Sequence, residues 1–357
     1  MLLYIGQKLA EQRKRRKITQ QELADFIGVT KASVSKWETG QSYPDITLLP
    51  LLAAYFDLSI DDLLNYHSQL APAEIQNIYR SLQESLKKSR EETWEALQRL
   101  LKNYYSCYPF VMQMGLFIIN HRDLLPSGRD YGKEAKELFE RVAKNTGDAQ
   151  LLDAATKMAA QCSLLLGETE EVFALLGEQA PVLLPAEPLI AGAYQQKGDL
   201  QAAISVSQSG LFQQMVVLMS GLTNYLQLLL EQPQTFSETF ARGEKIAAAF
   251  QLQQLHPVLY LNFLSSAIVG FASFELEEEL FATLETFSQL LQQIEFPATL
   301  HGDAYFDHIE DWIATLDLGN QIPRETSLVA QDFLDLLQHH PALANYQNDP
   351  RLQNLIH

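Results

Sequence analysis

Cysteine is nearly absent from this sequence of 357 residues, which contains only Cys107 and Cys162. Two cysteines are too few for a disulfide framework, so we expect two buried, reduced thiols in a cytoplasmic protein. Charged residues make up only 20% of the chain and hydrophobic residues 47%. This composition excludes a disordered tail protein and predicts more than one packed core.

Long apolar runs suited to export or membrane insertion are also lacking. We expect no signal peptide, because the apolar start Met1–Ile5 is short and the basic residues follow it. Residues 200–230 and 257–274 contain no charged residue, but both segments carry serine and asparagine. We therefore expect them to be central buried helices and not membrane spans.

Catalytic and nucleotide-binding motifs are missing as well. The chain has no phosphate-binding glycine loop, no G-x-S-x-G and no C-x-x-C. His301, Asp303, His308 and Glu310 lie close in sequence, but their spacing fits no tight metal site. We expect no cofactor, no metal and no enzymatic activity.

Charge is unevenly distributed along the chain. Residues 1–43 hold eight Lys or Arg and four Asp or Glu, a net charge of +4, although the whole chain carries −18. The remaining residues therefore carry −22. A basic head on an acidic body indicates that the head binds a polyanion and that the body repels one.

Apolar residues recur with helical spacing along the chain, and we find no convincing strand alternation, so we predict an all-α protein. A polar stretch near residue 70 separates a head, residues 1–66, from a linker and connecting helix, residues 67–88. The connecting helix is predicted because four apolar residues share one of its faces. These residues are Ile75, Ile78, Leu82 and Leu86.

The body, residues 89–357, contains a weak internal repeat. Gly167 and Gly198 each separate two helical segments and lie 31 residues apart. The pattern around the second glycine resembles a tetratricopeptide repeat, which implies an irregular tetratricopeptide-like α-solenoid. A generic helical body is the alternative. The residues that carry the resemblance are Ala191, Tyr194, Lys197, Gly198, Asp199 and Ala203.

Residues 19–40 form the most specific pattern in the chain. Thr19 and Glu22 can form a capping box, Gly28 can end that helix in a left-handed turn, and Thr30 can cap the next helix. On this next helix Ser33, Val34 and Trp37 share an apolar or small face. The opposite face is short, polar and basic, which suits the DNA major groove. It comprises Lys31, Ala32, Ser35, Lys36 and Thr39.

This stretch closely resembles the helix-turn-helix of the phage repressor and Cro family, the Xre-type regulators. The resemblance runs from about Ile5 to Leu64 and implies a lambda-repressor-like, five-helix domain that binds double-stranded DNA. It rests on Gln20, Glu22, Leu23, Ala24, Gly28, Val29, Ser33, Trp37, Glu38 and Gly40.

The resemblance also implies individual roles. Gln20 would contact a phosphate at the start of its helix, Arg13 would act structurally or on a phosphate, and Glu38 would support the fold. Thr39 and Gln41 would meet the phosphate strand. The full set placed at the DNA is Gln20, Thr30, Lys31, Ala32, Ser35, Lys36, Thr39, Gln41 and Arg13.

A repressor-type head on a tetratricopeptide-like body resembles the bacterial peptide-pheromone receptors. This resemblance implies a homodimer and a body that binds a peptide or protein effector. Asn120, Asn224 and Asn262 lie in apolar helical segments and are the candidate effector contacts, because an amide both donates and accepts hydrogen bonds. The alternative is a DNA-tethered protein-interaction scaffold with no small effector.

Overall fold

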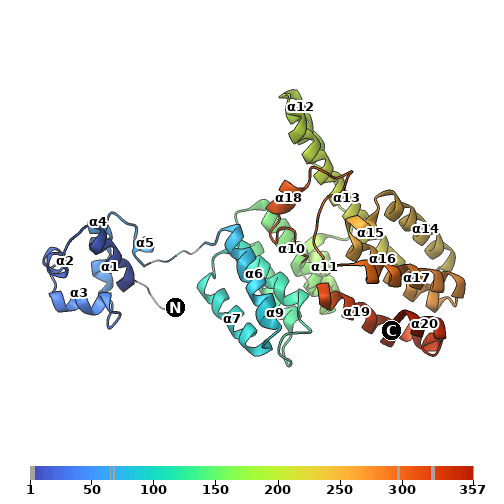
Figure 1. The fold of residues 1–357 in the computed structure, drawn as a ribbon, viewed down its shortest axis with the longest axis horizontal. Coiled ribbons are helices and arrows are strands. Elements are labelled where there is room, and N and C mark those ends of the chain that lie inside the picture. Colours follow the sequence, from blue (N-terminus) through green and yellow to red (C-terminus); the bar gives the residue numbers. More distant parts are fainter. Residues whose placement is uncertain (1–4, 65, 67–68, 296–297, 323–325, 357) are drawn as a thin grey trace. The chain divides into compact units, whose positions relative to one another are not determined.

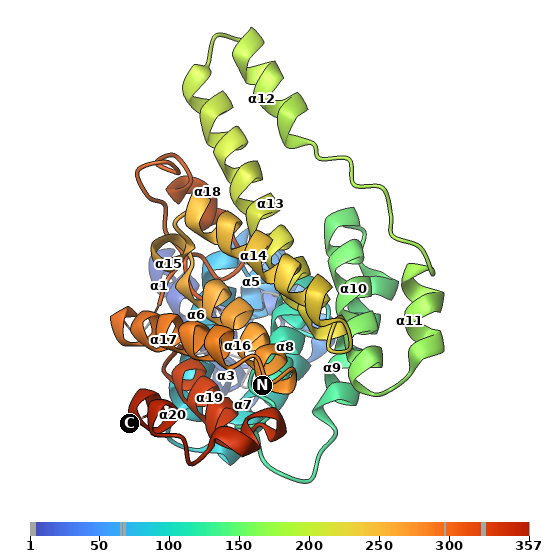
Figure 2. The same ribbon diagram turned by 90° about the vertical axis from the view of Figure 1, so that its right-hand side faces the viewer.

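The computed structural model consists of helices joined by turns and loops in the residues it describes, which are 5–64, 66, 69–295, 298–322 and 326–356 (Figures 1 and 2). Within these ranges there is no strand, only an isolated bridge between Thr299 and Gln321. The chain divides into two compact units. Unit 1 comprises Met1–Gly115 and Leu124–Leu175, and unit 2 comprises Leu116–Asp123 and Leu176–His357. The all-α prediction is confirmed.

Five α-helices and one 3-10 helix build the head around its own apolar core. Leu9, Leu23, Val34, Leu52 and Leu63 are fully buried in this core, and each comes from a different α-helix. The predicted five-helix domain is therefore present. Its elements are α1 (Ile5–Arg15), α2 (Gln20–Ile27), α3 (Lys31–Glu38), η1 (Ile46–Leu48), α4 (Leu49–Phe56) and α5 (Ile60–Leu64).

The rest of unit 1 starts with the predicted connecting helix, which buries Ile75, Tyr79 and Leu82 and leaves Ile78 only partly buried. The next helix begins after Ser89, whose hydroxyl accepts from the backbone N–H of Glu92. Cys107 and Cys162 are free and buried, as expected. The helices are α6 (Pro72–Leu86), α7 (Arg90–Asn103), α8 (Tyr108–Asn120), α9 (Tyr131–Asn145), α10 (Ala149–Leu165) and α11 (Thr169–Leu176). The end of α8, from Leu116, and Leu176 at the end of α11 belong to unit 2.

Unit 2 is organised around α16 (Pro257–Ser273), the most extensively buried helix of the chain's described part. Its buried side chains pack with those of α13, α14 and α17 in one large apolar cluster. The remaining elements are α12 (Glu187–Gln196), α13 (Leu200–Leu228), α14 (Pro233–Ala249), α15 (Leu252–Leu255), α17 (Glu277–Gln293), α18 (Glu310–Thr315), α19 (Thr326–His339), η2 (Pro341–Tyr346) and α20 (Pro350–Ile356).

Helical hairpins recur in the body, and the one at Gly198, α12 with α13, is a pair that the repeat predicted. Helices α9 and α10 pack together, as do α12 and α13, and α16 and α17. Gly167 and Gly198 have φ of +76° and +80°, so both glycines take the left-handed conformation expected at the turns. Figures 1 and 2 show α12 lying along the N-terminal part of α13, and this hairpin stands out from the other helices of unit 2.

The prediction that residues 200–230 form a central buried helix is wrong for one side of that helix. One face of α13 is buried, through Phe212, Met215, Met219 and Leu226. The opposite face stays exposed. By length and composition alone, this helix is long and apolar enough to cross a membrane. The second uncharged segment, α16, is a central buried helix as expected.

Candidate nucleic-acid interface

The helix-turn-helix forms because each helix end in residues 19–40 has its own hydrogen-bond partner. Thr19 and Glu22 make the predicted capping box at the start of α2, and the Thr30 hydroxyl accepts from the backbone N–H of Ser33 at the start of α3. Gly28 ends α2 with φ of +78°, a conformation in which a Cβ would be strained. These local signals hold α2 and α3 at a tight turn.

Helix α3 turns one face into the core and the other to solvent. Val34 and Trp37 are buried, whereas the predicted DNA-facing residues are exposed except for Ser35, which is half-buried. Lys31 and Lys36 make no ion pair with any residue in the described ranges, so their charges are available to an external anion. The exposed residues are Thr30, Lys31, Ala32, Lys36, Thr39 and Gln41.

Arg13 and Gln20 are held inside the domain by Glu38. The Arg13 guanidinium donates to both Glu38 carboxylate oxygens at 2.6 and 2.9 Å and to the carbonyl of Ile18. Gln20 donates its side-chain amide to the same carboxylate at 2.8 Å. Burial alone would raise the pKa of Glu38, but the hydrogen bonds from Arg13 and Gln20 hold that pKa below its ordinary value. Arg13 therefore has a structural contact, and Glu38 links α1, α2 and α3, while the phosphate contacts of Arg13 and Gln20 stay predictions.

A close backbone contact, which sequence reasoning missed, fixes α3 against α1. A Cβ at Gly6 would collide with the backbone carbonyl of Trp37. Only glycine lets the start of α1 approach the end of α3 this closely. A single glycine in a helical pattern gives little sign of such a contact, because the contact joins positions far apart in the sequence.

Two of the three candidate effector residues come together in unit 2. Asn224 on α13 and Asn262 on α16 line one groove with a volume of about 300 Å³, and both are exposed. Asn120, the last residue of α8, is half-buried and is not among the lining residues. The other lining residues are Ser220, Thr223, Gln227, Leu259, Ser265 and Ser266.

This groove is neutral and rich in hydrogen-bonding groups. Every lining side chain except Leu259 carries a hydroxyl or an amide, and none is ionisable at neutral pH. Thr223 and Ser265 donate to carbonyls of their own helices, and Gln227 reaches Ser266 at 3.3 Å. The side-chain amides of Asn224 and Asn262 have no recorded partner among the described residues. Such a groove suits an uncharged ligand that both donates and accepts.

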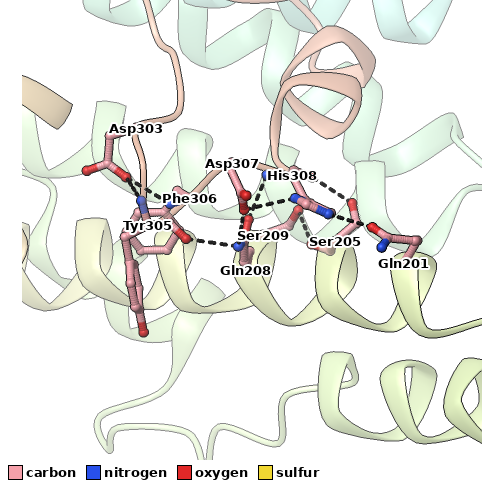
Figure 3. Close-up of polar contacts among 9 residues, drawn as sticks. All are labelled: Gln201, Ser205, Gln208, Ser209, Asp303, Tyr305, Phe306, Asp307 and His308. Atoms are coloured by element: carbon pink, nitrogen blue, oxygen red, sulfur yellow. Dashed lines mark hydrogen bonds and ion pairs between the residues drawn. The ribbon is translucent and has the colours of Figure 1, made fainter.

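Residues 301–310 contain the histidines and acids whose spacing fits no tight metal site. Hydrogen bonds join this segment to α13 (Figure 3). The His308 ring contacts Gln201 and Asp307 at 2.6 and 2.8 Å, and Ser205 donates to the His308 carbonyl. Asp303 accepts from two backbone N–H groups of its own turn, and Glu310 accepts from Gly302. Each of these side chains thus has a role in shaping the loop.

Comparison with known proteins places the head in a family. A family model described as Helix-turn-helix matches residues 9–63. The SPbeta prophage-derived uncharacterized HTH-type transcriptional regulator YonR of Bacillus subtilis (strain 168) is 33% identical over 103 residues, which cover 28% of this chain and 95% of YonR. The HTH-type transcriptional activator BcrR of Enterococcus faecalis is 34% identical over 72 residues, 20% of this chain. The chain spans about a third (35%) of BcrR's length.

A solved structure is similar over a longer stretch at a low level. Bacillus thuringiensis PlcR, in complex with the peptide PapR7 and DNA, is 13% identical, with a TM-score of 0.32. The matched region covers 81% of this chain and 95% of the PlcR chain. The helix-turn-helix geometry, the family match and the near-complete coverage of YonR agree with one another. The chain belongs to the Xre-type family of helix-turn-helix transcriptional regulators.

Proposed function

We propose that this regulator is a cytoplasmic protein, not an enzyme, that binds a pseudo-palindromic operator as a homodimer. The observation that carries the proposal is the outward face of α3, where Lys31 and Lys36 are exposed beside Ala32 and form no ion pair with the residues that the structure describes. Lysine donates to guanine O6 and N7, and an alanine methyl can contact thymine. A second head about 34 Å away, one helical turn of DNA, would double a small set of base contacts.

Removing either exposed lysine is expected to weaken operator binding. Lys31→Ala or Lys36→Ala should cost about 1–3 kcal/mol where the lysine contacts a base edge, and should relax the preference at that base pair. Gln20→Ala should weaken binding to all sequences alike. Fluorescence anisotropy on an operator selected from genomic fragments, against scrambled DNA, measures both effects.

Lys88→Ala, which removes one exposed lysine outside the head, is the matched control and should bind the operator like the wild type. The proposed docking is wrong if both α3 lysine variants also bind unchanged.

We further propose that the groove of Asn224 and Asn262 binds an uncharged peptide effector. Backbone N–H and C=O groups of an extended peptide match the neutral hydroxyls and amides that line this groove. A ligand that prefers one conformation of the body would raise the population of that conformation. It would thereby change the spacing of the two heads on DNA. In the scaffold alternative, a partner protein would find little apolar surface in this groove, because every lining side chain except Leu259 is polar.

A pool of synthetic, uncharged tetrapeptides is expected to raise the melting temperature of the wild-type protein. Ligand at a hundred times its Kd stabilises by about 2.7 kcal/mol. The double variant Asn224→Ala/Asn262→Ala should lose this response, because it lacks both amides. Asn145→Ala, an exposed asparagine on α9, should keep it. An equal rise in melting temperature for all three proteins would show that the peptide binds outside this groove. No rise for any of them would favour the scaffold alternative.

A further inference from the structure

A row of seven exposed residues runs along α13 on the side opposite its buried face. The residues are spaced alternately by four and three positions, which is the heptad spacing of a helix that packs against another helix. Leu211, Leu218, Tyr225 and Leu228 are 44%, 48%, 45% and 79% exposed. We call this row the α13 seam. It comprises Ser207, Leu211, Gln214, Leu218, Gly221, Tyr225 and Leu228.

Gly221, near the middle of the α13 seam, has no packing role within the described part of the chain. Gly210, Gly243 and Gly270 have one, because a Cβ there would collide with Glu187, Phe263 or Phe236, whereas Gly192 on α12, like Gly221, has none. A Cβ at Gly221 would meet nothing within 4 Å. Glycine inside a helix costs about 1 kcal/mol relative to alanine. An external helix that crosses closely at this point would make use of the missing side chain.

The charge distribution favours a second copy of this chain as that external partner. The whole chain carries −18, so two copies repel each other over most of their surface. Residues 200–230 are the longest stretch without a charged residue, and the α13 seam lies within it. Two copies can therefore approach through this surface without placing like charges side by side.

We propose that the α13 seam is the dimer interface, with the two α13 helices packed antiparallel about a twofold axis. This inference rests on the proposed homodimer and assigns its contact surface. In the heptad notation of paired helices, Leu211, Leu218 and Tyr225 form one series of the seam, and Ser207, Gln214, Gly221 and Leu228 form the other. When each series packs against the other series of an antiparallel partner, Leu211 of one copy lies opposite Leu228 of the other. In the same register Leu218 faces Gly221, and Gln214 faces Tyr225. Each larger side chain at the centre then meets a glycine or a flexible amide.

The first test is the mass of the full-length protein in solution. Leu218→Glu puts two carboxylates at the centre of the seam, so we expect the dimer dissociation constant to rise at least about hundredfold. Sedimentation equilibrium measures it, and circular dichroism verifies that the helices remain. Leu164→Glu on α10 is the control, because Leu164 is 65% exposed and lies off the seam. This control should dimerise like the wild type.

Cysteine pairs test the antiparallel register in the folded protein. The double variant Leu211→Cys/Leu228→Cys should form an intermolecular disulfide under mild oxidation, because the two positions face each other. Each single variant should not, since its own copies would lie about 25 Å apart along the helices. Cys107 and Cys162 are buried and do not compete. Strong crosslinking of either single variant would indicate a parallel pair and overturn the proposed arrangement.

The outcomes separate this inference from the proposed function. A wild-type dimer that Leu218→Glu leaves intact, and that the double cysteine variant does not crosslink, would overturn the α13 seam and leave the homodimer standing. A wild-type protein that stays monomeric both free and on its operator would overturn both. A monomer that floats with phosphatidylcholine vesicles, and stops doing so after Leu218→Glu, would assign the seam to lipid and overturn the dimer interface.

Discussion

Replacing Glu38 with glutamine is expected to destabilise the head by about 3 kcal/mol, because it leaves the Arg13 guanidinium without a counter-charge inside the domain. The side chains of Arg13 and Glu38 are only 14% and 6% exposed, so water replaces little of the lost interaction. Glutamine keeps the shape of glutamate and one acceptor oxygen. The loss therefore reports the charge and not the packing.

Hydrogen exchange in the full-length protein measures this effect locally. Backbone N–H groups of α1–α3 should exchange about a hundredfold faster in Glu38→Gln, while those of α16 should not change. Glu11→Gln is the control, because Glu11 is exposed and lies 3.9 Å from Lys8. It should change exchange less than threefold. Equal protection in Glu38→Gln and wild type would contradict a structural role for the pair.

The same pair makes a second variant informative. Arg13→Met/Glu38→Leu removes both charges together, so no unpaired charge remains, and much of the stability should return.

The sign of the pH dependence follows from the lowered pKa of Glu38. Its stabilisation is present above the pKa of the unfolded chain and is lost as the pH falls through the folded value.

The head could be read from the sequence because its signals are local. Thr19, Glu22, Gly28 and Thr30 act within three or four residues of themselves, and the 100° periodicity separates Trp37 from Lys36. The partnership of Glu38 with Arg13 spans 25 positions, and no local pattern reveals it. For the same reason, the burial of Gly6 against Trp37 follows only from the packing of α1 on α3.

The body was harder to read because α13 is apolar on two sides. Its buried residues, such as Met215 and Met219, and its exposed ones, such as Leu211 and Leu218, have similar hydropathy. A periodicity argument assumes one apolar face and one polar face, so it predicted burial for both sides. The residue type and the apolar surroundings in the sequence predict Asn224 and Asn262 as effector contacts. That they line one groove follows only from the packing of α13 on α16.

Unit 2 is expected to lose stability in mild acid through His256. This histidine caps α16, since its Nδ1 accepts from the backbone N–H of Leu259, and burial lowers its pKa to about 4, helped by the nearby His301. The folded state therefore resists protonation that the unfolded chain accepts below pH 6.5. The contribution of His256 is complete above pH 6.5 and is lost progressively as the pH falls towards 4, by about 3 kcal/mol in total.

His256→Asn isolates this contribution, because asparagine can cap the same helix and does not titrate. Between pH 7 and pH 5 the free energy of unfolding of the wild type should fall by about 2 kcal/mol more than that of the variant. Urea unfolding of both proteins at the two pH values gives this difference, and His339→Asn, at an exposed histidine of α19, should follow the wild type. Parallel losses in wild type and His256→Asn would show that protonation elsewhere governs unit 2. A difference confined to His256→Asn would instead tie the acid response to the capped end of α16, the helix that also carries Asn262 and one wall of the proposed effector groove.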